Sequence, residues 1–351
     1  IDLQDTKLVI DGLALNCCLF ENSGLDYRCG GQYDEFYQAV VAFFVALKSS
    51  HVHYFVVFDG AIDPSEKKLE TIKKRAEEGL ETVHELSTSG DIDSLVSFPL
   101  LFTDVFKQAL RDNGIPFAIC DSFIFDIKGG YIPLSFLRWK SGPLKAKIYY
   151  RSKLAAHFRI RSNLLPLFAS LAGNDYVSAK ALVDFKSALG RVQNDKRVGK
   201  RVTRFAKIVG FLRGLPSLCS QEEALKFTLE LITSQQSRNT LQHVIELSLQ
   251  EYKIKESNLL RYFEEGLIHS SLRTLLDKQE IEKWVLPHFR AGKFSIESMN
   301  SLTSGRNSLG IQIENFEEIS SNCCSLDLRK FVYGILSDVG TADGKIHRVQ
   351  C

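Results

Sequence analysis

Several features are missing from this sequence, and each absence narrows the class of protein. No apolar run approaches the ~18 residues that a membrane helix needs, and no secretory signal is visible. The eight cysteines form no Cys-x-x-Cys pair and no spacing typical of zinc sites. We therefore expect an intracellular protein with reduced thiols. The chain begins at Ile1 and its single Met is Met299, so we expect its natural beginning to lie outside this sequence.

A strong excess of charge is also missing. The net charge is only +2, so any attraction for a polyanion must come from local clusters of Lys and Arg. What the chain does have is length and apolar content, with 351 residues of which 44% are hydrophobic. It can bury a large core, as two or three domains or as one core with an appended lobe.

The first sixty residues predict a strand, a helix and a second strand. Residues 8–10 and 54–58 are apolar and strand-like, and residues 34–49 have apolar side chains at helical spacing. Strands joined through a helix run parallel, so Asp11 and Asp59, each followed by Gly, should lie at one carboxyl edge of a sheet, where ligands bind. Asp-Gly is also a hairpin signal, an alternative that the helical patterns after both pairs disfavour.

A third strand and an unusual junction follow. Residues 103–113 predict a helix and residues 115–120 a strand, and a further strand-like stretch, 121–127, starts at once with Asp121. A parallel crossover needs a dozen or more residues. We therefore expect part of the natural chain to be missing between residues 120 and 121. Residues 128–134 predict a turn and another strand.

A fourth carboxylate follows a buried helix. Residues 162–172 form a leucine-rich helical pattern that ends in Gly-Asn-Asp-Tyr, which contains Asp175. This ending is ordinary helix-terminating chemistry and carries no weight alone. The full set of candidate catalytic and metal-binding residues is Asp11, Asp59, Asp121 and Asp175.

Such carboxylates repel one another in a dry cleft unless a cation neutralises them. Carboxylate oxygens without Cys or His suit Mg²⁺ or Mn²⁺. Two such ions about 3.5 to 4 Å apart can activate water and stabilise the leaving oxygen of an in-line displacement. The pattern indicates metal-dependent hydrolysis of phosphodiesters, with two ions expected.

Two basic clusters accompany the carboxylates. The first, next to Asp59, contains the candidate substrate-phosphate ligands Lys67, Lys68, Lys73, Lys74 and Arg75. The second lies in residues 191–213, with eight Lys or Arg against one acid, and contains the candidate backbone-binding residues Arg197, Lys200, Arg201 and Arg204. For each cluster the alternative is a solvated basic face of a helix.

Four motifs in order carry a family resemblance: VIDG, VVFDG followed by a Lys-rich helix, DSFIFD and LAGNDY. Over residues 7–177 they resemble the flap-endonuclease-like nucleases of the xeroderma pigmentosum group G type, which have a PIN-like core, and most of all the asteroid group. By position, the four aspartates resemble the metal ligands of that family, and the first basic cluster resembles the residues that hold the scissile phosphate. The resemblance implies Mg²⁺, cleavage of DNA at junctions or single-stranded ends, and a nuclear role in DNA repair.

The sequence departs from the family pattern at three places. The acidic helix of the family has no counterpart at the junction of residues 120 and 121. The glycine-rich helix-turn-helix expected after Asp175 is absent, so the second basic cluster would replace it. Residues 75–98 are too short for a large arch, which favours an open site for overhangs or single strands.

We therefore predict an α/β fold, with a PIN-like core of a mostly parallel twisted sheet flanked by helices at 1–188, and a basic segment with a C-terminal helical lobe at 189–351. The predicted function is a metal-dependent, structure-specific DNA endonuclease acting at single-stranded or overhanging ends, with 3′ overhangs favoured and DNA-repair proteins as partners. A non-catalytic scaffold that binds nucleic acid or protein is the alternative. A haloacid-dehalogenase phosphatase is disfavoured because Leu13 stands where that fold needs a second Asp. We interpret His51 and His53 as structural.

Overall fold

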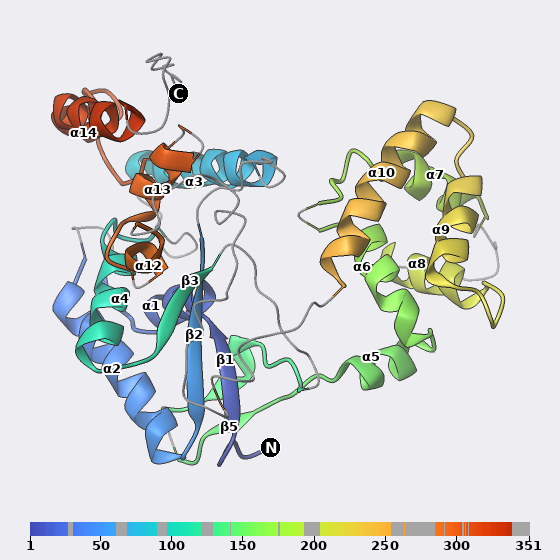
Figure 1. The fold of residues 1–351 in the computed structure, drawn as a ribbon, viewed down its shortest axis with the longest axis horizontal. Helices are drawn as coiled ribbons and strands as arrows, with labels where there is room; N and C mark the ends of the chain where they lie inside the picture. The colour runs from blue at the N-terminus through green and yellow to red at the C-terminus, as the bar shows by residue number, and fades with distance from the viewer. Residues whose placement is uncertain are drawn as a thin grey trace. The chain divides into compact units, whose positions relative to one another are not determined.

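The computed structural model (Figure 1) describes residues 1–26, 31–60, 69–89, 97–120, 129–140, 142–174, 176–192, 204–253, 263, 285–290, 292–303, 305, 307 and 309–338. The chain forms two compact units. The first contains the strands and the helices that lie before residue 147 and after residue 284, and the second contains the helices between Ile148 and residue 253. This grouping differs from the predicted division into 1–188 and 189–351, which stays a prediction.

A three-stranded parallel sheet is the centre of the first unit. Strands β1 (Lys7–Asp11), β2 (His53–Asp59) and β3 (Phe117–Cys120) lie side by side in the order β1-β2-β3. The register pairs Asp11 with Val57 and Asp59 with Cys120. The predicted α/β class with a parallel sheet flanked by helices is confirmed, and the first Asp-Gly pair leads into helix α1 and not into a hairpin.

Helices cover one face of this sheet (Figure 1). They are α1 (Gly12–Glu21), α2 (Tyr33–Ser49) and α4 (Phe102–Asp112). Five apolar residues of α2 lie at helical spacing, as predicted, and all five are buried: Phe36, Val40, Phe43, Phe44 and Leu47. Rings from β2 and the helices then pack together, with Phe58 and Phe106 centroids 5.8 Å apart. This aromatic layer fixes the helices against the strands.

The opposite face of the sheet has a smaller core. Phe55, Val57 and Ala118 are buried there, and Val9 and Phe263 pack against them. Because side chains alternate along a strand, Asp59 shares this face with Phe55 and Val57.

The remaining elements of the first unit are α3 (Leu69–Ser89), η1 (Leu134–Phe136), β4 (Leu137–Arg138), β5 (Lys145–Ala146), α12 (Val285–Arg290), α13 (Ile296–Thr303), η4 (Ser321–Ser325) and α14 (Leu326–Asp338).

The strand predicted within 128–134 is wrong. Tyr131 makes one antiparallel bridge to Tyr149, and the backbone then enters η1. Pro133 lacks the N–H that a longer ladder would need. The strand predicted at 121–127 lies outside the described residues.

The second unit is helical. It contains α5 (Arg151–Phe158), η2 (Ser162–Leu164), α6 (Leu165–Ala172), α7 (Val183–Val192), α8 (Arg204–Arg213), α9 (Gln221–Glu230) and α10 (Gln235–Glu251). Its core buries Leu167, Leu171, Phe185, Leu241 and Ile245. Helix α9 begins with a capping box, in which Ser220 and Glu223 bond to each other's backbone. Within the described residues, no helix combines the length and the apolarity needed to span a bilayer.

Candidate functional site

Asp11 and Asp59 lie at the same edge of the sheet, as predicted. Each is the last residue of its strand, and both are exposed. Asp11 pairs with Val57, which is two residues before Asp59, so both carboxylates belong to one face of the sheet. Strand spacing and rise place their Cα atoms ~8 Å apart, a separation at which two carboxylates can share a ligand between them.

Asp11 has a second, structural role as the N-cap of α1. Its Oδ1 accepts a hydrogen bond of 2.9 Å from the backbone N–H of Ala14. This bond satisfies one of the free N–H groups of the first turn and fixes the side chain at the start of the helix. The negative charge of Asp11 also affects Cys17, later in the same helix. Burial, followed by Glu21 and Asp11, raises the pKa of the Cys17 thiol to about 11, so this thiol stays protonated at neutral pH.

Gly12 explains why a glycine follows the first aspartate. A Cβ at Gly12 would lie 2.8 Å from the ring of Phe58, the residue before Asp59. Only glycine lets the start of α1 approach β2 this closely. The same ring is contacted on α4 by Lys107, whose Nζ lies 5.3 Å from the ring centroid. Phe58 thus joins the turn that carries Asp11 to the strand that carries Asp59.

Lys107 is a buried charge behind this edge that the sequence analysis missed. Its side chain is only 6% exposed. Burial lowers the pKa of Lys107, while Asp104 and Glu297 act in the opposite direction. The neighbouring layer is polar as well, because buried Asn16 donates a 3.0 Å hydrogen bond to Thr103. No spacing in the sequence signals this lysine, since its place depends on how α4 packs.

In the second unit, the residues on both sides of position 175 are held by hydrogen bonds. Gly173 has φ of +99°, which strongly favours glycine. The Asn174 amide oxygen accepts from the backbone N–H groups of Tyr176 (3.1 Å) and Val177 (3.0 Å). Its amide nitrogen donates to Ser248 (2.8 Å) and Tyr252 (3.2 Å). Asn174 therefore ties the backbone on both sides of position 175 to the end of α10.

Arg204, from the second basic cluster, lies beside this turn. Its Nη2 is 3.4 Å from the position that a Cβ at Gly173 would occupy. Its guanidinium also lies 5.7 Å from the ring centroid of Phe205. The pKa of Lys186 is lowered by burial and, to a smaller extent, by the positive charge of Arg204. The fold thus brings Arg204, a predicted ligand of the nucleic-acid backbone, next to Gly173, two residues before the predicted metal ligand Asp175.

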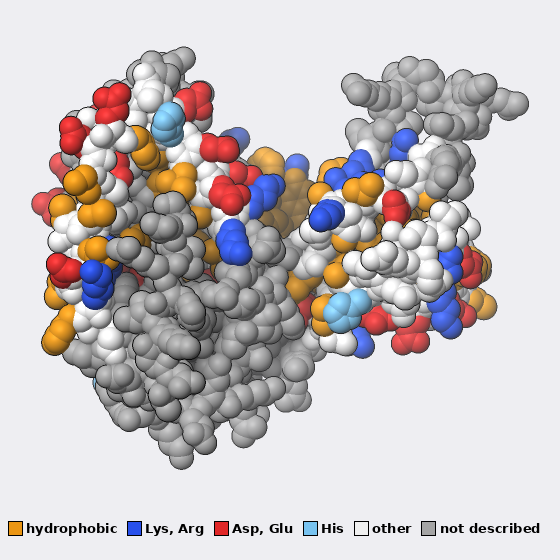
Figure 2. All heavy atoms as spheres, turned by 90° about the horizontal axis from the view of Figure 1, so that it is seen from above, with side chains coloured by type: hydrophobic (Ala, Val, Ile, Leu, Met, Phe, Trp, Pro, Cys, Tyr) orange, Lys and Arg blue, Asp and Glu red, His pale blue; other side chains and the backbone are white. Residues whose placement is uncertain are grey.

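Helix α3 carries the described part of the first basic cluster. Lys73, Lys74 and Arg75 lie in its first half, and five glutamates are spread along the same helix. Lys74 pairs with Glu78 at 3.4 Å, an exposed contact of small energetic value. Figure 2 shows acidic and basic side chains mixed over the face that includes α3. Any phosphate contact by these residues would be local and not the effect of a broad positive field.

Several predicted site residues lie outside the described residues: Asp121, Asp175, Lys67, Lys68, Arg197, Lys200 and Arg201. Among the residues that are described, no three His, Cys, Asp or Glu side chains gather as a metal-binding group. The pair that is described, Asp11 and Asp59, offers exposed carboxylate oxygens, the ligand type that Mg²⁺ and Mn²⁺ prefer.

The fold and the site define an α/β protein with two aspartates at the carboxyl edge of a parallel sheet. No family model matches the chain. The human single-strand DNA endonuclease ASTE1 is 31% identical, with 96% of this chain and 53% of that protein covered. The mouse protein of the same name is 29% identical over the same shares, and Protein asteroid of Drosophila melanogaster is 25% identical over 75% of this chain and 39% of that protein. The chain is a homologue of the asteroid proteins. It spans about half the length of the ASTE1 proteins that it matches.

Proposed function

We propose that this chain is the nuclease part of a metal-dependent DNA endonuclease that hydrolyses phosphodiesters at single-stranded or overhanging ends. The observation that carries the proposal is the pair of exposed carboxylates, Asp11 and Asp59, on one face and at one edge of the parallel sheet. This is the position at which open α/β folds bind their ligands. The name of the human and mouse relatives, single-strand DNA endonuclease, supports the substrate class.

Asp11 and Asp59, with Asp121 and Asp175 from the predicted set, would hold Mg²⁺ or Mn²⁺. A bound divalent cation supplies Lewis acidity, which eases deprotonation of the attacking water and neutralises charge on the phosphate. The protein needs no nucleophile of its own for this reaction. Lys73, Lys74 and Arg75, with Lys67 and Lys68, would bind the substrate phosphates, and the second basic cluster around Arg204 would bind the backbone of the strand.

A tyrosine pair in the second unit supports a single-stranded substrate. Tyr131 and Tyr149 exchange two backbone hydrogen bonds of 2.8 Å, so their side chains stand on the same face of a two-residue ladder. Their exposed fractions are 66% and 39%. Next to them, Lys153 Nζ lies 5.2 Å from the ring centroid of Tyr150. Exposed rings beside cations are the usual platform on which unpaired bases stack.

The finer parts of the proposal rest on the family resemblance. They are a preference for 3′ overhangs, a role in DNA repair with repair-protein partners, and a nuclear location. The short segment between α3 and α4 supports access by strand ends, because only residues 90–101 separate these two helices.

The experiment is cleavage of end-labelled single-stranded, duplex, 5′-flap and 3′-overhang DNA by the full-length protein with Mg²⁺, with Mn²⁺ or with EDTA. Asp59→Asn and Asp11→Asn keep the side-chain shape and remove the charge. Asp327→Asn, an exposed aspartate on α14 that pairs with Lys330, is the matched control. We expect metal-dependent cutting that falls at least a hundredfold in the first two variants and is unchanged in the control.

Cutting that survives both site variants would refute the proposed site. Binding of single-stranded DNA without cutting in either metal would instead support the alternative, a non-catalytic scaffold that binds nucleic acid. The 5′- and 3′-labelled products of the same reactions give the polarity of cleavage.

A further inference from the structure

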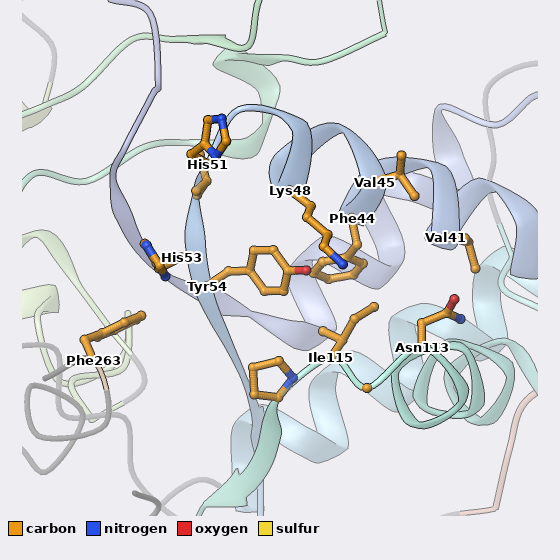
Figure 3. A pocket seen from close by; sticks show the side chains of 13 residues that line it. Val41, Phe44, Val45, Lys48, His51, His53, Tyr54, Asn113, Ile115 and Phe263 are labelled. Carbon is orange, nitrogen blue, oxygen red and sulfur yellow. The ribbon is translucent and has the colours of Figure 1, made fainter. Parts of the chain in front are cut away.

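A cavity of about 620 Å³ at the amino edge of the sheet contains three basic side chains that do not converge. Figure 3 shows Lys48 beside Tyr54, on one side of β2. His53 lies toward Phe263 on the other side, and His51 points away from both groups. No single ligand group can therefore contact all three basic side chains. A set of cations that does converge lies on the hairpin formed by β4 and β5.

This hairpin belongs to a part of the sequence with a strong excess of positive charge. Residues 127–174 contain nine Lys or Arg and no Asp or Glu. The portion in the first unit ends at Lys147 and includes both strands of the hairpin. A local excess of this kind attracts a polyanion even though the net charge of the whole chain is only +2.

The register of the hairpin places three cations on one face. Arg138 and Lys145 are Cα partners in the antiparallel pair, so their side chains point to the same side. Lys147 follows Lys145 by two residues and shares that side. Its Nζ lies 5.1 Å from the ring centroid of Phe136, which adds an aromatic ring to the group. All four residues are exposed, whereas Ala146, on the other side of β5, is buried. We call these four residues the ribbon face.

The charges of the ribbon face are poorly compensated within the protein. Like charges directly opposite each other on paired strands destabilise the pair, and Arg138 lies opposite Lys145. In the part of the chain that the structure describes, Arg138 forms no ion pair. Lys145 pairs with Asp2 at 3.8 Å, but both side chains are largely exposed, so this contact is weak. A bound anion would relieve the remaining repulsion.

The hairpin is fixed at the amino edge of the central sheet (Figure 1). The N–H of Leu3, shortly before β1, donates to Leu144 O at 2.8 Å. Lys140 donates to Asn22 O at 2.6 Å, at the end of α1 that lies farthest from Asp11. The length of β1, ~13 Å, separates this edge from Asp11, which corresponds to about four nucleotides at the 3.4 Å spacing of a DNA strand.

We propose that the ribbon face binds a nucleic-acid strand outside the nuclease site, with Arg138, Lys145 and Lys147 on backbone phosphates and Phe136 against an unpaired base. Cations beside an exposed ring favour single-stranded nucleic acid, because the ring offers a stacking surface that an acidic peptide would not use. The choice of DNA as the ligand rests on the proposed function. Binding at the ribbon face does not itself require cleavage.

The test is fluorescence polarisation of a labelled dT dodecamer with the full-length protein in EDTA, at a series of salt concentrations. The triple variant Arg138→Gln, Lys145→Gln and Lys147→Gln should weaken binding at least tenfold at the lowest salt. It should also lower the slope of log affinity against log salt by about 2, because each phosphate contact on a single strand contributes roughly 0.7.

A matched triple variant removes the same charge from exposed positions elsewhere: Lys226→Gln, Lys253→Gln and Lys293→Gln. It should keep the slope of the unmodified protein. Equal slopes in the two triple variants would overturn the proposal, because only the general charge of the protein would then matter.

The ring is tested by Phe136→Ala, which should weaken binding of the dT dodecamer at least fivefold and leave duplex binding unchanged. Phe136→Trp should retain binding, and Phe227→Ala, at an exposed position on α9, is the control. If Phe136→Ala and Phe227→Ala had equal affinity, the stacking contact would be refuted. If polyglutamate displaced the dodecamer from the unmodified protein as well as unlabelled dT does, the ribbon face would belong to an acidic protein segment and the proposal would fail.

Cleavage assays with Mg²⁺ separate this proposal from that of the nuclease. Binding that depends on the ribbon face, without any cutting by the unmodified protein, would refute the nuclease and support the ribbon face. Cutting of a strand whose affinity is the same in the ribbon-face and control variants would refute the ribbon face alone.

Discussion

The ring of Phe58 occupies the space that a side chain at Gly12 would need. The closest ring atoms lie 2.8 Å from an ideal Cβ on Gly12, a distance that real Cβ atoms essentially never show. Gly12→Ala must therefore displace either the start of α1 or the buried Phe58 ring, and both changes disturb the contact between the turn that carries Asp11 and the strand that carries Asp59. We expect this variant to lose about 1–3 kcal/mol of unfolding free energy, the usual cost of overpacking, and to lose activity. Urea denaturation and the DNA cleavage assay measure the two effects.

Two further variants separate this clash from the general effect of replacing glycine. Gly190, inside α7, has no atom within 4 Å of an added Cβ and no positive φ. Gly190→Ala should raise stability by about 0.5–1 kcal/mol, because alanine is the better helix former. In the double variant Gly12→Ala with Phe58→Leu, part of the loss should be recovered, since the smaller side chain can make room. If the loss of activity in the double variant equalled the added losses of Gly12→Ala and Phe58→Leu, the contact between these two residues would not be the cause.

The placement of Asp11 and Asp59 could be predicted because it follows from chain connectivity. Two strands joined through a helix run parallel, and their last residues meet at one edge whatever the packing details are. The closeness of Gly12 to Phe58 could not be predicted, because it depends on how α1 crosses β2. The dipeptide Asp-Gly in the sequence does not show whether the glycine is needed for a turn or for a close contact.

The same limit applies to Asn174 and Lys107. Asn174 bonds to Ser248 and Tyr252, which are 74 and 78 residues away, and no local pattern indicates such a pairing. Lys107 has the spacing of an ordinary exposed residue on α4, and its burial, with its contact to the Phe58 ring, comes from tertiary packing. The strand predicted within 128–134 failed for a local reason, since Pro133 and the 3₁₀ turn after it end the ladder at one bridge.

Asn174→Ala should loosen the turn that leads to position 175. The change removes two acceptor bonds to backbone N–H groups and two donor bonds to α10 and its C-cap. We expect a loss of about 1–3 kcal/mol, the cost of leaving such polar groups without partners. Asn239→Ala, an exposed position on α10, is the matched control and should change stability by less than about 0.5 kcal/mol. Equal urea midpoints for the two variants would contradict the role given to Asn174.

Lys107→Met should change how stability depends on pH. Burial lowers the folded-state pKa of Lys107 below 10.5, so the folded protein binds this proton less tightly than the unfolded chain does. The cost of burying the charge is fully present below the lowered pKa, and it is relieved as pH rises from there toward 10.5. We expect the methionine variant to be more stable at pH 7 and the difference to shrink above the lowered pKa.

Urea unfolding of both proteins between pH 7 and 10 measures this difference. Lys226→Met, at an exposed position on α9, serves as the control and should follow the unmodified protein at every pH. If the difference in unfolding free energy between Lys107→Met and the unmodified protein stayed constant across this range, Lys107 would affect stability through packing alone. Its charge would then make no contribution.

The tyrosine pair gives the clearest separation of single-stranded from duplex binding. Stacking on an aromatic side chain contributes about 1–3 kcal/mol per base, and every unpaired base has a face that can stack. Replacing Tyr131 and Tyr149 together with alanine should therefore weaken binding of single-stranded DNA by at least tenfold. Duplex binding should barely change, because paired bases present no free face. Fluorescence polarisation with a labelled dT oligomer and its duplex measures both affinities at one fixed salt concentration.

The decisive comparison is a second double variant, Tyr131→Phe with Tyr149→Phe. Phenylalanine keeps the ring and removes the hydroxyl, so binding through stacking should be retained in this double variant. If the phenylalanine and alanine variants lost affinity equally, the hydroxyl groups and not the rings would hold the strand. If neither lost affinity, single-stranded DNA would bind elsewhere, and the basic cluster around Arg204 would become the next surface to change, because its effect should depend strongly on salt and little on strandedness.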